Sequence, residues 1–114
     1  FLKNNNYNFI VNISEDGWFG NSIGPHQHFA HTIFRSIEYG KYTLRSANNG
    51  ISAIIDPTGK AIKKIKINDE GALILKKIKN INKTAFSEFG NKIYFLVILL
   101  YIFLIFSFKS FENE

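Results

Sequence analysis

The hydrophobic pattern of the first third of the chain predicts a strand followed by a helix. Residues 7–14 are rich in apolar and β-branched side chains, which predicts a buried strand. Residues 25–39 predict a helix that begins near Pro25 and ends before Gly40, which suits a left-handed cap. Apolar side chains recur there at three- and four-residue spacing, so we expect a core-facing side made of Phe29, Ala30, Ile33, Phe34 and Ile37.

The next part of the chain has the pattern of short strands. Residues 42–47, 51–56, 60–67 and 72–78 are expected to form four successive strands. Asn49-Gly50 favours a type I′ hairpin, and residues 56–59 (DPTG) favour a type I turn. One helix and one further strand give such a sheet little cover, so we expect additional sequence to complete the domain.

Residues 93–108 form an apolar, uncharged run of 16 residues between Lys92 and Lys109. A spanning helix needs about 17–25 residues, and lysines at both ends can extend toward the lipid headgroups. We therefore expect a transmembrane helix, and the alternative is a buried core helix. The expected layout is a domain over residues 1–83, a linker over 84–92, the helix over 93–108 and a cytoplasmic tail over 109–114.

The composition bears on where the chain belongs in a protein and on its chemistry. The sequence holds no Met and begins with Phe1, so we interpret it as the C-terminal piece of a longer protein. It also holds no Cys, which excludes disulfides, thiolate metal sites and a cysteine nucleophile within these residues. The net charge is +5, and many lysines alternate with isoleucines in residues 60–66 and 76–83. A solvated sheet face explains this alternation better than a patch for lipid headgroups or nucleic acid.

Two groups of polar residues suggest specific chemistry, and both have a simpler explanation. His26, His28 and His31 lie near one another in sequence, but the first points away from the other two on a helix, so we expect no metal site. Arg35 and Glu38 are three residues apart on the predicted helix, and Arg45 on the next strand lies within possible reach. We interpret these three as structural ion pairs.

The segment Asp16-Gly17-Trp18-Phe19-Gly20 is harder to explain as a plain turn. It places two large aromatic side chains between glycines directly after the first predicted strand. Loops at the carboxyl ends of strands hold ligands in many α/β folds, and aromatic side chains provide an apolar wall. A core plug beneath the sheet is the alternative, and the residues alone favour neither.

Three stretches closely resemble sequences typical of bacterial apolipoprotein N-acyltransferases. Residues 12–28 read NISEDGWFGNSIGPHQH, residues 35–38 read RSIE and residues 44–52 read LRSANNGIS. TAF at residues 84–86 and GN at 90–91, followed by the apolar run, are similar to the family's exit into its last transmembrane helix. Glu15 departs from the family's usual Asn at that position.

The resemblance implies a fold, an activity and a cellular location. The fold would be the C-terminal part of a nitrilase-like (carbon-nitrogen hydrolase) α-β-β-α sandwich, followed by one transmembrane helix. The family transfers an acyl chain from a phospholipid donor to the N-terminal amino group of a diacylated apolipoprotein. It would work at the bacterial inner membrane on the periplasmic side, without a metal, another cofactor or nucleic acid.

The resemblance also implies which part of the site this chain supplies. The family uses a cysteine that forms a thioester, a glutamate base and a lysine that stabilises the oxyanion. All three would lie upstream of Phe1, so this piece alone should be inactive. Its expected contribution is the wall of the substrate pocket, formed by Trp18, Phe19, Gly20, His26, Gln27 and His28. Two other functions stay open: a different membrane-tethered amidase of the nitrilase superfamily, and a non-catalytic membrane-anchored binding module.

Overall fold

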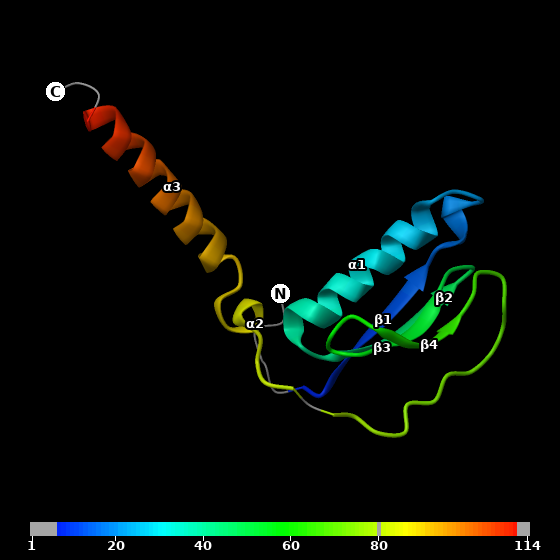
Figure 1. Cartoon of the computed structure of the whole chain (residues 1–114). Coiled ribbons are helices and arrows are strands. Elements are labelled where there is room, and N and C mark those ends of the chain that lie inside the picture. The colour runs from blue at the N-terminus through cyan, green and yellow to red at the C-terminus, as the bar shows by residue number, and fades with distance from the viewer. Residues whose placement is uncertain (1–6, 80, 112–114) are drawn as a thin grey trace. The chain divides into compact units, whose positions relative to one another are not determined.

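The computed structural model describes residues 7–79 and 81–111, which divide into two compact units, Phe1–Thr84 and Ala85–Glu114. The second unit holds two helices, α2 (Ala85–Phe89) and α3 (Lys92–Phe111). The first unit holds a mixed sheet and one long helix (Figure 1). Its elements are β1 (Phe9–Glu15), a 3₁₀ turn (Gly17–Phe19), α1 (Gly24–Tyr39), β2 (Tyr42–Asn48), β3 (Ser52–Ile55) and β4 (Ala61–Ile65).

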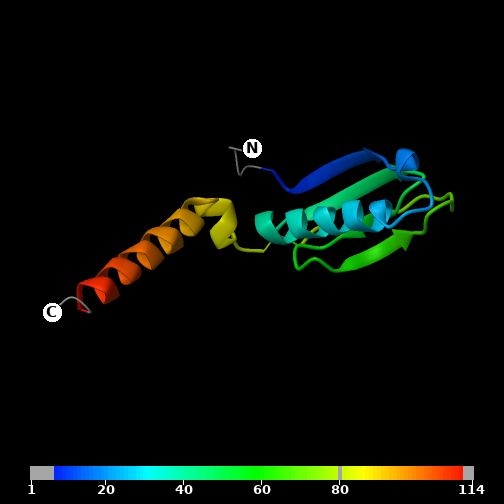
Figure 2. The same cartoon turned by 90° about the horizontal axis from the view of Figure 1, so that it is seen from above.

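The sheet has the strand order β1-β2-β3-β4. β1 and β2 are parallel and are joined by α1, whereas β2, β3 and β4 pair antiparallel through short turns. Figures 1 and 2 show α1 running along one face of this sheet. The predicted mixed α/β class is confirmed, and one sheet covered by a helix fits half of a nitrilase-like sandwich.

Both ends of α1 follow the predicted signals, but its inner face does not. Pro25 lies in the first turn, and Gly40 adopts a left-handed conformation with φ 61°. The buried side of the helix contains small polar residues, among them Ser36, whose hydroxyl donates to the Thr43 hydroxyl of β2 at 2.7 Å. Phe34 and Ile37 are exposed, so the predicted apolar core face is wrong at these two positions. Polar side chains of the sheet, such as Thr43, face α1, and the small polar residues of the helix lie against them.

The apolar core of the first unit is small and lies mainly on β3. Its buried members are Ile51, Ala53, Ile54 and Ile55. The prediction that residues 7–14 form a buried strand is wrong on one face, because Ile13 is 83% exposed and its neighbours on that face are also exposed. β1 is an edge strand, and α1 covers only the opposite face.

The turns and the last predicted strand differ in outcome. At residues 56–59 the Gly59 N–H donates to the Asp56 carbonyl at 3.0 Å, which confirms the predicted turn. At the β2–β3 connection Asn49 has a positive φ of 52° whereas Gly50 does not, so the type I′ hairpin is wrong. Residues 72–78 form no strand, although their pattern alternates. The Lys63 ammonium donates to the Ile74 carbonyl at 2.7 Å, and no ladder forms along this segment.

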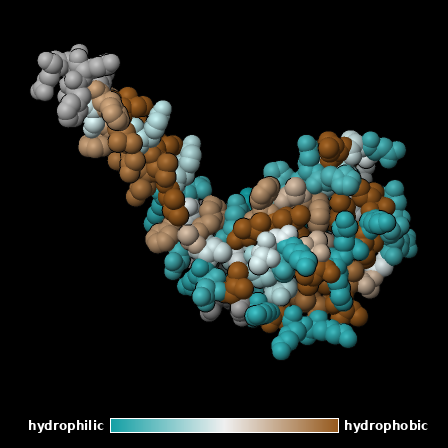
Figure 3. Space-filling model, in the orientation of Figure 1, coloured by the Kyte–Doolittle hydropathy of each residue, from teal (hydrophilic) through white to brown (hydrophobic). Residues whose placement is uncertain are grey.

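The second unit contains the predicted apolar run within α3. Figure 3 shows hydrophobic side chains in brown along much of this helix. Its uncharged stretch would extend about 24 Å at 1.5 Å per residue, against a hydrocarbon core of about 30 Å. In the part of the chain that the structure describes, no helix is both long and apolar enough to cross a membrane. The helix is confirmed and the predicted span is not.

The Asp56 turn gives a first prediction. The Asp56 carboxylate accepts from the Thr58 N–H at 2.8 Å, the Thr58 hydroxyl at 2.6 Å and the Lys60 N–H at 3.0 Å. We expect Asp56→Ala to lower the free energy of unfolding by about 1–2 kcal/mol, because these donors lose a charged acceptor. Thermal unfolding of the complete gene product measures this. Asp69→Ala, in an exposed loop, is the control, and equal effects of both changes would contradict the account.

Candidate functional site

Polar side chains from β1, α1 and β2 meet beneath the 3₁₀ turn and form one buried cluster. They come from positions that face one another across the sheet, since Asn12 of β1 pairs in register with Arg45 of β2. The helix lies over the same positions. We call this group the Asp16 cluster, and its members are Asn12, Ser14, Asp16, His28, Thr32 and Arg45.

The centre of the cluster is an ion pair removed from water. The Arg45 Nη2 lies 2.8 Å from the Asp16 Oδ2, and both side chains are 0% exposed. The other two guanidinium nitrogens also bind acceptors: Nε donates to the Ile51 carbonyl at 3.1 Å and Nη1 donates to the Thr32 hydroxyl at 2.9 Å. Nη1 also donates to the side-chain oxygen of Asn12. A buried charge is tolerated when it is paired and additional hydrogen bonds surround it in this way.

The second oxygen of the Asp16 carboxylate binds two more donors. The Ser14 hydroxyl lies 2.5 Å from Oδ1, and the His28 Nδ1 lies 2.8 Å from it. A carboxylate only accepts hydrogen bonds, so Nδ1 carries the proton. The other ring nitrogen, Nε2, is then the acceptor when the imidazole is neutral. His28 is therefore tied to the cluster on one side.

The environment of Asp16 determines its protonation. Burial alone raises the pKa of Asp16, but hydrogen bonds from Ser14 and His28 and the charge of Arg45 outweigh it. The net pKa lies below the ordinary value of 3.8. A carboxylate held in this state is a poor general base near neutral pH. The Asp16 cluster therefore has a structural role: it fixes the position of the loop after β1.

The Asp16 cluster fixes the loop that contains the two aromatic residues. The Asp16 N–H donates to the Asn48 carbonyl at 3.0 Å, which joins the loop to the end of β2. Phe19 lies edge-on to His28, with ring centroids 5.8 Å apart, and Trp18 lies 5.3 Å from Phe19. Trp18 is 81% exposed. The turn thus exposes the Trp18 indole at the surface, and the Asp16 cluster holds the turn in place.

Two glycines allow this close packing. A Cβ on Gly50 would lie 2.2 Å from the Asp16 Oδ2, and a Cβ on Gly24 would lie 2.3 Å from the Phe19 ring. No larger residue fits at either position without moving the carboxylate or the ring. Both glycines belong to the stretches that carried the resemblance in the sequence.

The predicted site residues fall into separate places. Trp18, Phe19 and His28 lie together, whereas His26 and Gln27 are exposed on the first turn of α1. Gly20 follows the turn with φ 55°. Within residues 7–79 and 81–111, no three His, Asp or Glu side chains are grouped so that they could hold a metal ion.

The three residues interpreted as structural ion pairs do not form one network. Arg35 lies 2.8 Å from Glu38 on the outer surface of α1. Arg45 instead points into the core and pairs with Asp16. The sequence analysis missed Asp16 as its partner, along with Asn12, Ser14 and Thr32. The register of β1 against β2 would have been needed to find them.

Comparison with known proteins identifies the family of this fold. The family model for carbon-nitrogen hydrolases matches residues 1–80. The chain belongs to the carbon-nitrogen hydrolase family. The matched range contains the whole sheet, α1 and every residue of the Asp16 cluster.

Individual relatives of the chain carry a more specific name. The chain is 46% identical to an apolipoprotein N-acyltransferase of Rickettsia bellii and 42% identical to that of Rickettsia prowazekii, in both cases over 92% of this chain and 21% of the relative. It is 46% identical to that of Bradyrhizobium diazoefficiens over 62% of this chain and 13% of the relative. The chain therefore spans about a fifth of the length of the Rickettsia relatives.

The contrast between the two ion pairs gives a second prediction. Asp16→Ala leaves the Arg45 charge buried without its partner, and we expect a loss of about 3–5 kcal/mol in the free energy of unfolding. Glu38→Ala removes an exposed pair and should cost less than about 1 kcal/mol. Chemical denaturation of the complete gene product compares them. Similar losses for the two variants would show that the Asp16 pair is not buried as described.

The lowered pKa of Asp16 gives a third prediction, on acid stability. Because the folded pKa lies below the unfolded one, the contribution of Asp16 is fully present above the unfolded value of about 3.9. It is lost as the pH falls through the lower, folded value. We expect Asp16→Asn to flatten the fall in stability below about pH 4, measured as the thermal midpoint against pH. An unchanged profile would contradict the depressed pKa.

Proposed function

We propose that the protein carrying this chain is an apolipoprotein N-acyltransferase. It would transfer an acyl chain from a phospholipid to the N-terminal amino group of the diacylglyceryl-cysteine of lipoproteins. The observation that carries the proposal is the similarity to acyltransferases over 92% of the chain, which includes the Asp16 cluster and the Trp18 turn. Either a different amidase of the same superfamily or a non-catalytic module would be the alternative.

In this proposal the chain contributes shape rather than reactive groups. The thioester would form on a cysteine elsewhere in the protein, because this sequence contains none. The general base and the oxyanion-stabilising lysine would also lie outside it, and the chain alone would be inactive. Residues 1–83 would be the C-terminal part of the catalytic domain.

Trp18 and Phe19 would form the wall that the acyl chain contacts. An indole that is 81% exposed leaves apolar surface in water, at a cost of about 4 kcal/mol relative to full burial. An acyl chain lying on the indole would recover part of that free energy. Phe19, His28 and Asp16 hold the turn in place, so little ordering would be needed on binding. Gly20, His26 and Gln27 would line the entrance.

The donor also suggests where the protein works. Phospholipid acyl chains are found in a bilayer, and α3 exposes many large apolar side chains, among them Phe95, Leu99 and Phe103. We propose that this helix holds the domain at the inner membrane on the periplasmic side. The expected linker and tail overlap the ends of α3 (Lys92–Phe111), so residues 84–91 would link the domain to this helix.

The activity can be tested in cells that depend on it. The complete gene product would be expressed in bacteria depleted of their own N-acyltransferase, and the N-terminus of a lipoprotein would be analysed by mass spectrometry. We expect a third acyl chain on the amino group. A free amino group on the diacylated lipoprotein, with the protein present at the membrane, would overturn the proposal. Hydrolysis of simple amides by the same preparation would favour the amidase.

The Trp18 turn gives a fourth prediction. Trp18→Ala should reduce acyl transfer at least about tenfold by removing apolar contact with the acyl chain, with little change in stability because the indole is exposed. Trp18→Phe should retain most activity. The control is Phe34→Ala, which removes an exposed aromatic side chain from α1. Equal activity of Trp18→Ala and Phe34→Ala would exclude Trp18 from the pocket.

A further inference from the structure

The positive charge of the chain is concentrated in β4 and the segment that follows it. Residues 60–83 contain eight lysines and two acidic residues, a net charge of +6, whereas the whole chain has +5. The rest of the chain therefore has a net charge of −1. β4 is the edge strand farthest from β1, and none of the lysines of this region belongs to the Asp16 cluster or the Trp18 turn. We call it the lysine surface, and its lysines are Lys60, Lys63, Lys64, Lys66, Lys76, Lys77, Lys79 and Lys83.

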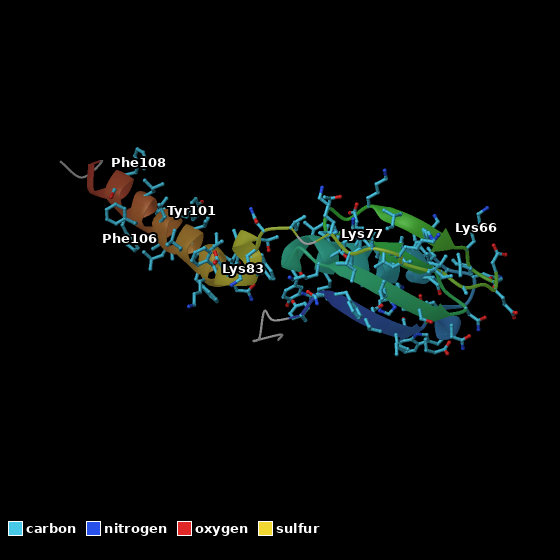
Figure 4. All side chains as sticks on the ribbon, turned by 90° about the horizontal axis from the view of Figure 1, so that it is seen from below. Lys66, Lys77, Lys83, Tyr101, Phe106 and Phe108 are labelled. Carbon is cyan, nitrogen blue, oxygen red and sulfur yellow. The ribbon has the colours of Figure 1, made fainter. Side chains whose placement is uncertain are left out.

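The charges on the lysine surface are offset only in part, since Lys60 interacts with the Asp56 carboxylate. All eight lysines are exposed. Over the described part of the chain, the ion pairs formed are those of His28, Arg35 and Arg45, and none involves a lysine of this surface. Lys63 donates to the Ile74 carbonyl and thereby ties the segment after β4 to the strand. Figure 4 labels Lys66 and Lys77 on this segment.

Apolar side chains are exposed among these lysines. Ile74 is 64% exposed, and Ile62 and Ile81 are exposed as well. Lysine alone on an edge strand guards against pairing with other sheets, but that role does not account for exposed isoleucines beside it. Cations interleaved with apolar side chains are typical of a surface that lies in the headgroup region of a membrane.

We propose that the lysine surface binds the anionic headgroups of a phospholipid bilayer, with its isoleucines entering the interface. A nucleic acid fits less well, because residues 60–83 contain no aromatic side chain on which bases could stack. The inference extends the proposed function, since a phospholipid donor would lie in the same bilayer. It does not depend on acyl transfer, and it uses residues outside the candidate site.

Lysine labelling measures the contact directly. The complete gene product would be mixed with liposomes of phosphatidylcholine, with or without phosphatidylglycerol, and treated with an amine-reactive reagent. Mass spectrometry then gives the labelling rate of each lysine. We expect the lysines of this surface to react several-fold more slowly with the anionic liposomes and to recover at high salt, since salt screens exposed charges. The rate of each lysine with liposomes of phosphatidylcholine alone is its own reference.

Two matched variants separate charge from side-chain bulk. Lys64, Lys66, Lys76 and Lys77 would be changed together to Glu in one variant and to Arg in the other. Protection of Lys60, Lys79 and Lys83 should disappear in the Glu variant and persist in the Arg variant, because each cation near an anionic membrane increases binding about fivefold.

The same experiment can overturn the inference while leaving the acyltransferase proposal intact. Equal labelling rates with both kinds of liposome would exclude anionic lipid as the partner. Protection that survives in the Glu variant would show that charge does not cause it. Protection by double-stranded DNA in the absence of protection by anionic liposomes would assign the surface to nucleic acid. Loss of lipoprotein acylation is measured separately and would bear only on the proposed function.

Discussion

The buried contact between Asp16 and Arg45 is the interaction on which the first unit depends. Two opposite charges buried away from water are stable only if additional hydrogen bonds surround the pair. That requirement places Asn12 opposite Arg45 in the β1–β2 register and places Thr32 of α1 above them. It also explains why the carboxylate lies against Gly50, where a side chain would collide with it. The helix, two strands and a turn are thereby held at one point.

The same contact between Asp16 and Arg45 connects the core with the Trp18 turn, which is proposed to bind the acyl chain. Asp16 is the first residue after β1, so fixing its side chain also fixes where the following turn begins. His28 connects the carboxylate with Phe19, and Phe19 supports Trp18. An exposed aromatic side chain on a rigid support can bind an apolar ligand with little loss of side-chain and loop freedom. The sheet and α1 form this support, and the similarity to acyltransferases is the reason for proposing an acyl chain as the ligand.

Local signals allowed much of the fold to be predicted from the sequence. Pro25, Gly40 and the residues of the Asp56 turn act through their own backbone preferences, and each lies where it was predicted. The face of α1 could not be predicted in the same way, because apolar and small polar residues both recur at helical spacing. Residues 72–78 alternate as a strand does, but they form no backbone ladder with the free edge of β4, and the Lys63 side chain binds the Ile74 carbonyl instead.

The partner of Arg45 shows why the candidate site could be predicted only in part from the sequence. Glu38 was the acidic residue grouped with Arg45 in the sequence analysis. The parallel pairing of β1 and β2 instead brings Asp16, 29 residues away in sequence, to Arg45. Such long-range pairs depend on register, which a single sequence does not reveal. The aromatic turn was recognisable from its composition, and its role in a substrate pocket stays a prediction.

The most direct test is to replace Trp18 with a photoreactive phenylalanine analogue in the complete gene product and irradiate it in membranes that contain labelled phospholipid. The account predicts a cross-link between residue 18 and a phospholipid acyl chain, and no such cross-link from the same analogue at Phe34. Cross-links from residue 18 to protein segments alone, or equal lipid cross-linking from both positions, would contradict the claim that the Asp16 cluster presents Trp18 to the acyl donor.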